Sequence, residues 1–443
     1  MRRMLAVGMA IALLALSWTP APTSAAPAAQ AVVSGAWRIR ADQGDAAISS
    51  TLELRISGDT VEGSSGPLDT LGAYPLKLHG ARSPTGLHLV AVSEGETVGA
   101  LDLSIKDNVL TGSGRLFGTP VILSGARAVP ADRPPATYDF DPTQFHVLTS
   151  NAPAPVLHLV PGDTVRTRTV DNYGRDEKGA PAAMPGNPGT GPFYVDGAMP
   201  GDTLVVHILK LTPNRATARM ARSLAGTAIE PGYTQKPDPR RTDTWLLEPQ
   251  NGIARIETPS PRLKDFKVAL RPMLGVVGVA PPAGASVSNS DLGEWGGNLD
   301  FPEMRQGVTL YLPVFQPGGM LFMGDAHARQ GDGEVTGQGL ETSMAVEFQV
   351  GVIKGENLGQ PWSENADDIM VSGVGGSLND ALQRATTGLA KWLKTRYQLD
   401  DTDVAAVLGS SLELQIAEVV DPKYHVVARL KKQTLSQIAP IKP

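Results

Sequence analysis

The sequence contains no cysteine among its 443 residues. This absence excludes a disulfide framework, an iron–sulfur cluster, a thiolate zinc site, a cysteine nucleophile and a lipid-modified cysteine anchor. A blue-copper site is excluded as well, because its cysteine ligand is missing. Any metal must therefore be held by histidine, carboxylate or backbone oxygen.

An excess of positive charge is also missing. The chain has 39 Lys and Arg against 45 Asp and Glu, which gives a net charge of −6. A mildly acidic chain argues against nucleic acid as a partner. After the first 18 residues, no segment is long and apolar enough to span a membrane, so no membrane partner is expected either.

The N-terminus reads as an export signal. Met1-Arg2-Arg3 precedes an apolar run from Met4 to Trp18, and small residues that suit a signal peptidase end near Ala26. The run is shorter than the ~20 residues that a bilayer requires, so a retained anchor is the weaker interpretation. We expect a signal peptide over residues 1–26 and a secreted or periplasmic protein, with the export route left open.

Glycine and proline are plentiful, with 48 and 36 copies, so turns should be frequent and long helices few. Residues 32–128 form short alternating segments that turn signals separate at intervals of about ten. This pattern predicts a meander of about eight strands that closes into a small barrel or sandwich. Residues 129–140 are rich in proline and predict a linker.

The rest of the chain divides into a mainly β body, residues 141–355, and an α+β C-terminal subdomain, residues 356–443. Two Pro-Gly-Asp turns, beginning at Pro161 and Pro200, launch strands in the body. In the subdomain, Ser377 and Asp380 form a capping box ahead of a helical pattern. A second helix is expected from Asp401 to Leu408, ended by Gly409, with strands after it.

The densest polar cluster runs from Gly324 to Glu334. In an extended backbone, Asp325 and His327 share one face, and so do Asp332 and Glu334. Imidazole and carboxylates are what a divalent metal requires when thiols are absent. On these residues alone, a polar loop with ordinary Asp-Gly turns stays an open alternative.

Weaker clusters lie elsewhere. Asn298 and Asp300 share a face after paired glycines, a rigid loop from Gly186 enters a strand at Thr190, and Asp171 ends another strand. None of these spacings identifies a reaction unaided. Four more histidines stay open as further ligands, namely His146, His158, His207 and His425.

Several of these segments, in this order, resemble the acetamidase/formamidase family. The resemblance covers about Asp141 to the C-terminus. It rests on Asp171 and five motifs that follow it: the run from Asn187 to Asp202, Gly296 to Asp300, Leu310 to Val314, Gly324 to Val335, and the closing segment from Tyr397 to Val420-Asp421-Pro422.

The resemblance implies a β-sandwich amidohydrolase that cleaves the C–N bond of short-chain amides, giving carboxylate and ammonia. It implies a divalent metal, zinc in the first instance with calcium as the alternative, and a homo-oligomer such as a dimer stays open. On this resemblance we assign roles to nine residues: His327, Asp325 and Asp171 as metal ligands, Glu334 as general base, Asp332 as its orienter or as an alternative ligand, and Asn298, Asp300, Thr190 and Asn187 as substrate-binding groups.

Three departures from the family pattern bear on substrate. The strand that ends at Asp171 continues with Asn172, where the family pattern suggests Asp-Cys. An expected export signal and an extra β domain precede the body. Residues 221–251 form a long insert. An exported ligand-binding β protein that has kept the scaffold without the reaction is therefore the second hypothesis.

Overall fold

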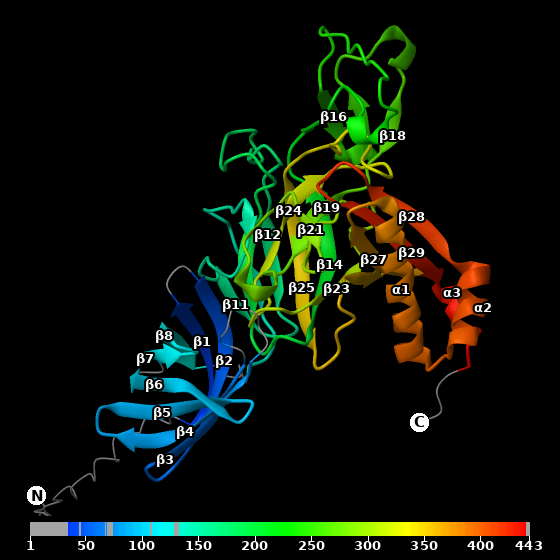
Figure 1. Cartoon of the computed structure of the whole chain (residues 1–443). Helices are drawn as coiled ribbons and strands as arrows, with labels where there is room; N and C mark the ends of the chain where they lie inside the picture. The colour runs from blue at the N-terminus through cyan, green and yellow to red at the C-terminus, as the bar shows by residue number, and fades with distance from the viewer. Residues whose placement is uncertain are drawn as a thin grey trace, which may run out of the picture.

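The computed structural model describes residues 34–43, 46–66, 68, 74–106, 109–127 and 133–439. The expected signal peptide and the first part of the expected linker lie outside the described residues. Figure 1 shows a mainly β molecule with a barrel beside a sandwich, a small β lobe above the sandwich, and the helices gathered near the C-terminus. Among the described residues, no helix combines the length and the apolar character that a membrane crossing needs.

The N-terminal domain is a closed eight-stranded antiparallel barrel, in which the first strand also pairs with the last. Inward-facing side chains alternate along each strand, as Trp37, Ile39 and Ala41 do, and they fill the interior with apolar groups. The predicted meander is confirmed, and it is a barrel. Its strands are β1 (Gly35–Gln43), β2 (Ala46–Ser57), β3 (Thr60–Ser65), β4 (Leu76–Ser83), β5 (Gly86–Ser93), β6 (Glu96–Lys106), β7 (Val109–Leu116) and β8 (Thr119–Arg127).

The first sheet of the body has six strands, and its central members are buried along their whole length. Because both faces of these strands are covered, their burial does not alternate, and β13 and β24 are mostly apolar apart from Thr190, Asp325 and His327. The order across the sheet is β11 (Leu157–Leu159), β13 (Thr190–Val195), β24 (Leu321–His327), β19 (Met273–Gly278), β22 (Gly296–Asn298) and β21 (Leu292–Gly293).

The second sheet has nine strands and faces the first. One apolar core joins them, with Phe193 and Leu321 from the first sheet and Val206 and Phe348 from the second. The body is therefore a β-sandwich, as expected. The order is β28 (Glu413–Glu418), β29 (Tyr424–Lys431), β27 (Asp368–Gly375), β26 (Trp362–Glu364), β23 (Thr309–Pro313), β14 (Thr203–Pro213), β25 (Met344–Ile353), β12 (Thr164–Arg168) and β9 (Thr137–Asp139).

The C-terminal strands β27, β29 and β28 extend the nine-stranded sheet, and helix α1 (Leu378–Tyr397) packs on β27 and β29. The Ser377 side chain accepts from the Asp380 N–H at 3.1 Å, which confirms the predicted helix start. Helix α2 (Asp401–Ser411) continues past Gly409, so the predicted end at Leu408 is wrong. A glycine inside a helix costs only about 1 kcal/mol, and this one did not stop α2. A short helix α3 (Lys432–Leu435) follows β29.

The expected insert, residues 221–251, is part of a lobe over residues 217–269 that has its own four-stranded sheet. Its strands are β15 (Thr217–Arg219), β16 (Thr244–Glu248), β17 (Ile253–Ile256) and β18 (Lys267–Ala269). Its small core includes Ala328 and Leu340, which lie directly beside His327 and Glu341 in the sequence. The lobe therefore covers the end of β24 (Figure 1). Shorter elements complete the fold: β10 (Leu148–Thr149), β20 (Val287–Ser288) and 3-10 turns at Gly226–Ala228, Pro249–Asn251, Pro261–Leu263 and Pro282–Gly284.

The two Pro-Gly-Asp turns form the same local structure. The Asp163 side chain accepts a hydrogen bond from the backbone N–H of Val160, and the Asp202 side chain accepts one from Met199. In both cases the donor lies three positions earlier in the chain, just before strand β12 or β14 begins. The repeated device seen in the sequence is thus a repeated hydrogen bond, which fixes where each strand starts.

Candidate active site

The polar centre of the body forms at the end of β24. Asp325 and His327 are both buried there, and Asp325 Oδ1 lies 3.5 Å from His327 Nε2. Asp325 has a φ of 48°, so the strand is not regular at this point, yet the expected pairing of the two side chains is confirmed.

Glu341 completes a first group with these two residues. It faces His327 across an isolated β-bridge, and its Oε1 lies 3.0 Å from His327 Nε2. The Gly339 N–H donates to the same oxygen at 2.9 Å. One ligand-type atom from each of Asp325, His327 and Glu341 lies within 4.8 Å of the others. We call these three residues the histidine group.

Gln330 fixes the imidazole. Its Nε2 donates to the carbonyl oxygens of Asp300 and Ala417, so its Oε1 must face His327 and accept the Nδ1–H at 2.8 Å. In the neutral imidazole the proton is therefore on Nδ1, and Nε2 is the atom that can bind a metal. Such a partner orients a metal-binding histidine in many proteins.

A second group of acids lies on the other side of His327. Asp300 Oδ1 is 3.8 Å from His327 Nδ1, and Glu334 offers an oxygen within 4.8 Å of both. Asp421, from the turn between β28 and β29, adds a third carboxyl that interacts with Asp300 and Asp325. We call Asp300, Glu334 and Asp421 the carboxylate group.

Asn187 and Asn298 link the two groups. The Asn187 amide donates to Asp325 Oδ2 and to Asn298 Oδ1, each at 3.1 Å. Asn298 in turn donates a short hydrogen bond to Asp421. Three of the four predicted substrate-binding residues, Asn187, Asn298 and Asp300, are therefore brought together at the centre.

The fourth, Thr190, is not. Its hydroxyl donates to the Arg168 carbonyl at 2.8 Å, within the buried strand β13. Asp332, expected beside Glu334, is exposed and accepts from the Gln415 side chain at 2.7 Å. Neither residue belongs to the two groups.

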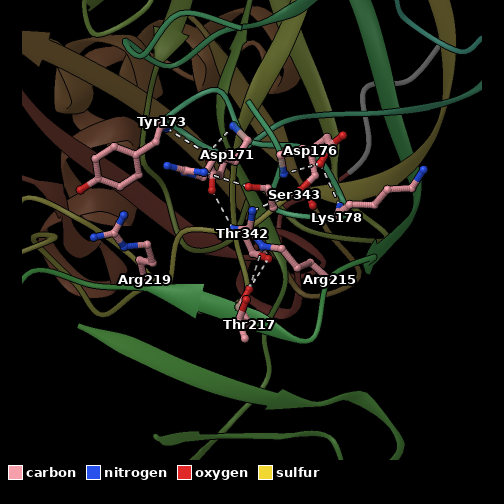
Figure 2. Close-up of polar contacts among 12 residues, drawn as sticks. Asp171, Tyr173, Asp176, Lys178, Arg215, Thr217, Arg219, Thr342 and Ser343 are labelled. Carbon is pink, nitrogen blue, oxygen red and sulfur yellow. Dashed lines mark hydrogen bonds and ion pairs between the residues drawn. The ribbon is translucent and has the colours of Figure 1, made fainter. Parts of the chain in front are cut away.

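Asp171 belongs to neither group. Figure 2 shows it beside Tyr173 and Arg215 instead. Its Oδ2 accepts from the Arg215 guanidinium at 2.7 Å, and its Oδ1 accepts the backbone N–H groups of Tyr173 and Arg175. Both carboxylate oxygens already have partners, so we leave Asp171 out of the ligand set. The four further histidines lie outside the two groups as well, and the His425 Nδ1–H donates to the Leu299 carbonyl instead.

Sequence reasoning gave no role to Glu341, Gln330 or Asp421. Gln330 lies inside the polar cluster from Gly324 to Glu334, and Asp421 lies in a motif of the family resemblance. The sequence therefore held a signal for both residues. Glu341 follows a glycine-rich loop, and only the return of that loop brings it opposite His327.

Burial and crowding of like charges govern the protonation of the centre. Burial first, and then the charges of neighbouring acids, raise the pKa of Asp300 well above its ordinary value. Burial is also the main cause that raises the pKa of Glu334 well above the usual range, and that of Glu341 and Asp421 to about 7. Burial opposes a charged imidazole, but the Glu341 and Asp325 carboxylates outweigh it and raise the pKa of His327.

Backbone strain is concentrated in the same place. Four residues of the centre adopt left-handed φ values, 54° at Asn187, 39° at Asp300, 48° at Asp325 and 45° at Glu334. Non-glycine residues in this region each cost about 1–3 kcal/mol and persist where surrounding structure imposes them, which is common at functional sites.

The histidine group fits a divalent metal. Asp325 Oδ1, His327 Nε2 and Glu341 Oε2 are buried polar atoms without a hydrogen-bond partner. Leaving such atoms unpaired is costly, and a cation that they share removes the cost. One imidazole nitrogen with two carboxylates is an ordinary zinc donor set.

Fold and centre together define a class: a mainly β protein whose sandwich encloses a strained, metal-compatible histidine and carboxylate site. The family model described as "Acetamidase/Formamidase family" matches residues 283–422, which include every member of both groups. An acetamidase structure from Yersinia enterocolitica has 31% sequence identity and a TM-score of 0.59, with 70% of this chain covering 96% of that one. The chain therefore belongs to the acetamidase/formamidase family.

Two more relatives agree. The structure of a predicted acetamidase/formamidase from Thermoanaerobacter tengcongensis has 27% identity and a TM-score of 0.59, with 68% of this chain covering 98% of that one. The formamidase of Methylophilus methylotrophus is 43% identical over 60 residues, which are 13% of this chain and 15% of that protein. The sequence alignment with this curated relative thus spans only a small part of its length.

Proposed function

We propose that this protein is a metal-dependent amidohydrolase that cleaves the C–N bond of short-chain amides such as formamide and acetamide, giving a carboxylate and ammonia. The observation that carries the proposal is the convergence of Asp325, His327 and Glu341, with unpartnered buried atoms, inside the segment that the family model matches. The names of the relatives support the substrate class.

We propose zinc as the cation of the histidine group, held by Asp325, His327 and Glu341, because calcium prefers sites made of oxygen alone. When bound, a divalent cation supplies Lewis acidity, which polarises an amide carbonyl and makes water more acidic. Gln330 keeps the His327 Nε2 free for this purpose by holding the proton on Nδ1.

Asn187 and Asn298 orient the amide. A side-chain amide has two N–H donors, and Asn298 gives one of them to Asp421, so the other remains for a substrate carbonyl. The bonds from Asn187 to Asn298 and Asp325 hold this arrangement beside the histidine group. Positioning of this kind lowers the barrier by fixing the reacting atoms in place.

Glu334 moves the protons. Its carboxyl is buried, and burial raises its pKa well above that of an exposed glutamate, so it exchanges a proton more readily near neutral pH. We assign it the removal of a proton from the attacking water and the delivery of a proton to the leaving nitrogen. Asp332 has no part in this step, since its side chain is exposed.

The test is ammonia release by the purified full chain from formamide, acetamide and larger amides, before and after chelation and after addition of zinc. We expect turnover of the small amides, its loss on chelation and its return with zinc. His327→Ala should abolish both zinc content and turnover, whereas His207→Ala, which removes a histidine bonded to Thr309, should keep both. Absence of turnover on every amide despite stoichiometric zinc would overturn the proposal.

The alternative, an exported ligand-binding protein on an inactive scaffold, is not favoured, because the ionisable residues of both groups are present together. We also propose that the protein acts outside the cytoplasm after removal of residues 1–26. N-terminal sequencing of the exported protein tests this, and a cytoplasmic, uncleaved chain would contradict it.

A further inference from the structure

The segment from Ile416 to Asp421 touches the centre at three points. Three hydrogen bonds join them: from the Asn298 amide to the Asp421 carboxylate, from the Gln330 amide to the Ala417 carbonyl at 3.3 Å, and from the Val419 N–H to the Gly333 carbonyl at 3.1 Å. The first begins on the residue that we assign to amide binding, and the third ends beside Glu334. The conformation of this segment therefore sets the positions of groups that the proposed reaction uses.

Glu418 lies inside this segment and is fully buried, at a point where the strand is irregular. The register of β28 against β29 shifts between Ile416 and Glu418. In a regular strand Glu418 would share a face with Leu414 and Ile416, which are 49% and 43% exposed. The shift therefore turns an acid inward while two apolar residues stay outside, which reverses the usual distribution. Irregularities of this kind redirect single side chains and are frequent next to active sites.

The Glu418 carboxyl holds the turn that carries Asp421. Its Oε2 accepts the backbone N–H groups of Val420 and Asp421, at 2.9 and 3.0 Å. Its other oxygen, Oε1, is buried without a hydrogen-bond partner in the described part of the chain. Burial first, and then the Asp421 charge, raise the pKa of Glu418 to about 8. At pH 7 the carboxyl is therefore mostly protonated, and it serves the turn as a neutral acceptor.

We propose that Glu418 is a positioning residue of the amidase: by holding the turn before Asp421, it places the Asp421 carboxylate against Asn298 and so directs the remaining Asn298 N–H at the substrate carbonyl. The inference rests on the proposed function, in which Asn298 orients the amide. Glu418 acts through this series of hydrogen bonds and not on the reacting atoms. It needs only an acceptor oxygen at Oε2, which the side-chain amide of glutamine also provides.

Steady-state kinetics of acetamide hydrolysis by the zinc-loaded full chain test the proposal. In Glu418→Ala the two turn N–H groups lose their acceptor, so we expect kcat/KM to fall roughly tenfold to hundredfold, mainly through kcat. Zinc content should stay that of the parent protein, because the histidine group is unchanged. Glu418→Gln keeps the acceptor and should restore kcat/KM to within about threefold of the parent value. Glu418→Met, which has a similar length and no acceptor oxygen, serves if Glu418→Ala does not fold.

A double substitution separates positioning from a simple loss of structure. If Glu418 acts through Asn298, then Glu418→Ala should cost little further activity in an Asn298→Ala background, whereas independent effects would multiply. Asp202→Ala is the structural control, because Asp202 is a buried carboxylate outside both groups that also accepts two backbone N–H groups, from Met199 and Gly355. This control should lower the free energy of unfolding in urea and leave kcat unchanged.

Parent activity in a folded, zinc-loaded Glu418→Ala or Glu418→Met variant would overturn the inference. A loss that multiplies with that of Asn298→Ala would also overturn it, and so would a Glu418→Gln variant as slow as Glu418→Ala. The parent protein separates this failure from that of the proposed function. An active parent with a fully active Glu418→Ala variant sinks only the role of Glu418, whereas a zinc-loaded parent without turnover on any amide sinks the proposed function and this role with it.

Discussion

Glycines that have no chemistry of their own make space for the residues that do. A Cβ on Gly275 would lie 2.4 Å from Asp300 Oδ1 and 2.8 Å from Asp325 Oδ2, and one on Gly339 would lie 2.4 Å from His327 Nδ1. Neither glycine has a positive φ. Glycine is therefore required at these positions because the neighbouring side chains approach the backbone closely, and not because of its conformational freedom. Part of the glycine surplus of the sequence is therefore site architecture.

The substitution Gly275→Ala should impair metal binding without unfolding the protein. The added methyl group displaces the Asp300 and Asp325 carboxylates, so we expect zinc affinity to fall by about tenfold or more, as for other disturbances around metal ligands. Competition with a zinc-binding dye measures the affinity. Gly351→Ala is the matched control, because its nearest atom, Val205 Cβ, is 3.4 Å away. Equal zinc affinity in the two variants would contradict the assignment.

Elements are positioned by local hydrogen bonds that recur along the chain. The Pro-Gly-Asp turn before β12 holds Asp163 against the N–H groups of Val160 and Ala136 and against the Arg133 guanidinium. Burial alone would raise the pKa of Asp163, but Arg133 and the two N–H groups outweigh it and hold the pKa below its usual 3.8. This carboxylate thereby ties residues 133–136 to the first strands of the body.

A depressed pKa in the folded state contributes stability above the unfolded pKa and loses it as pH falls further. Asp163→Asn should therefore lower the free energy of unfolding by about 1–3 kcal/mol at pH 7 and pH 5. As pH falls below about 4, the usual pKa, towards the lower folded-state pKa, the difference from the parent protein should shrink, because Asp163 is protonated first in the unfolded state and finally in both states. Urea unfolding at several pH values measures it. Asp139→Asn, at an exposed carboxylate, should show little effect, and a difference that grew towards acid would refute the argument.

The whole molecule contains two β domains that meet at Arg38. Arg38 of the barrel pairs with Asp196 of the body at 2.7 Å and lies 4.6 Å over the Tyr194 ring. A cavity of about 270 Å³ remains beside this contact, lined in part by Pro153 and Pro317. About 70% of the chain covers almost the whole of the solved relatives, and we propose that the barrel is the part without a counterpart in them.

Charge reversal at the contact should loosen the barrel without touching the site. In Arg38→Glu, the new carboxylate repels Asp196, so we expect faster proteolytic cleavage between the domains and a larger radius of gyration by small-angle X-ray scattering. Turnover of amides should stay within about twofold, because every member of the histidine group and the carboxylate group lies outside the barrel. Arg55→Glu, on an exposed barrel position, is the control. Loss of turnover in Arg38→Glu alone would show that the barrel contributes to catalysis.

Period-two alternation predicted the barrel strands, because side chains on a strand must alternate between core and solvent. Local signals also predicted the start of α1 and the strands after the Pro-Gly-Asp turns, since a capping or turn residue acts on its own neighbours. The end of α2 was missed because the glycine penalty at Gly409 is small against the helix that surrounds it. The sequence by itself thus determined the β class, the order of the motifs, and the pairing of Asp325 with His327 two residues apart.

Only the tertiary structure decided which carboxylates meet. Asp171 is neutralised by Arg215, 44 positions later, while Glu341 and Asp421 reach the centre on a returning loop and a distant turn. Sequence spacing sets the face on which a side chain lies, but the burial and counter-charge of a carboxylate depend on segments far away in the chain. Those long-range contacts, and not the local pattern, determine which carboxylates lack a protein partner and are therefore available to bind a cation.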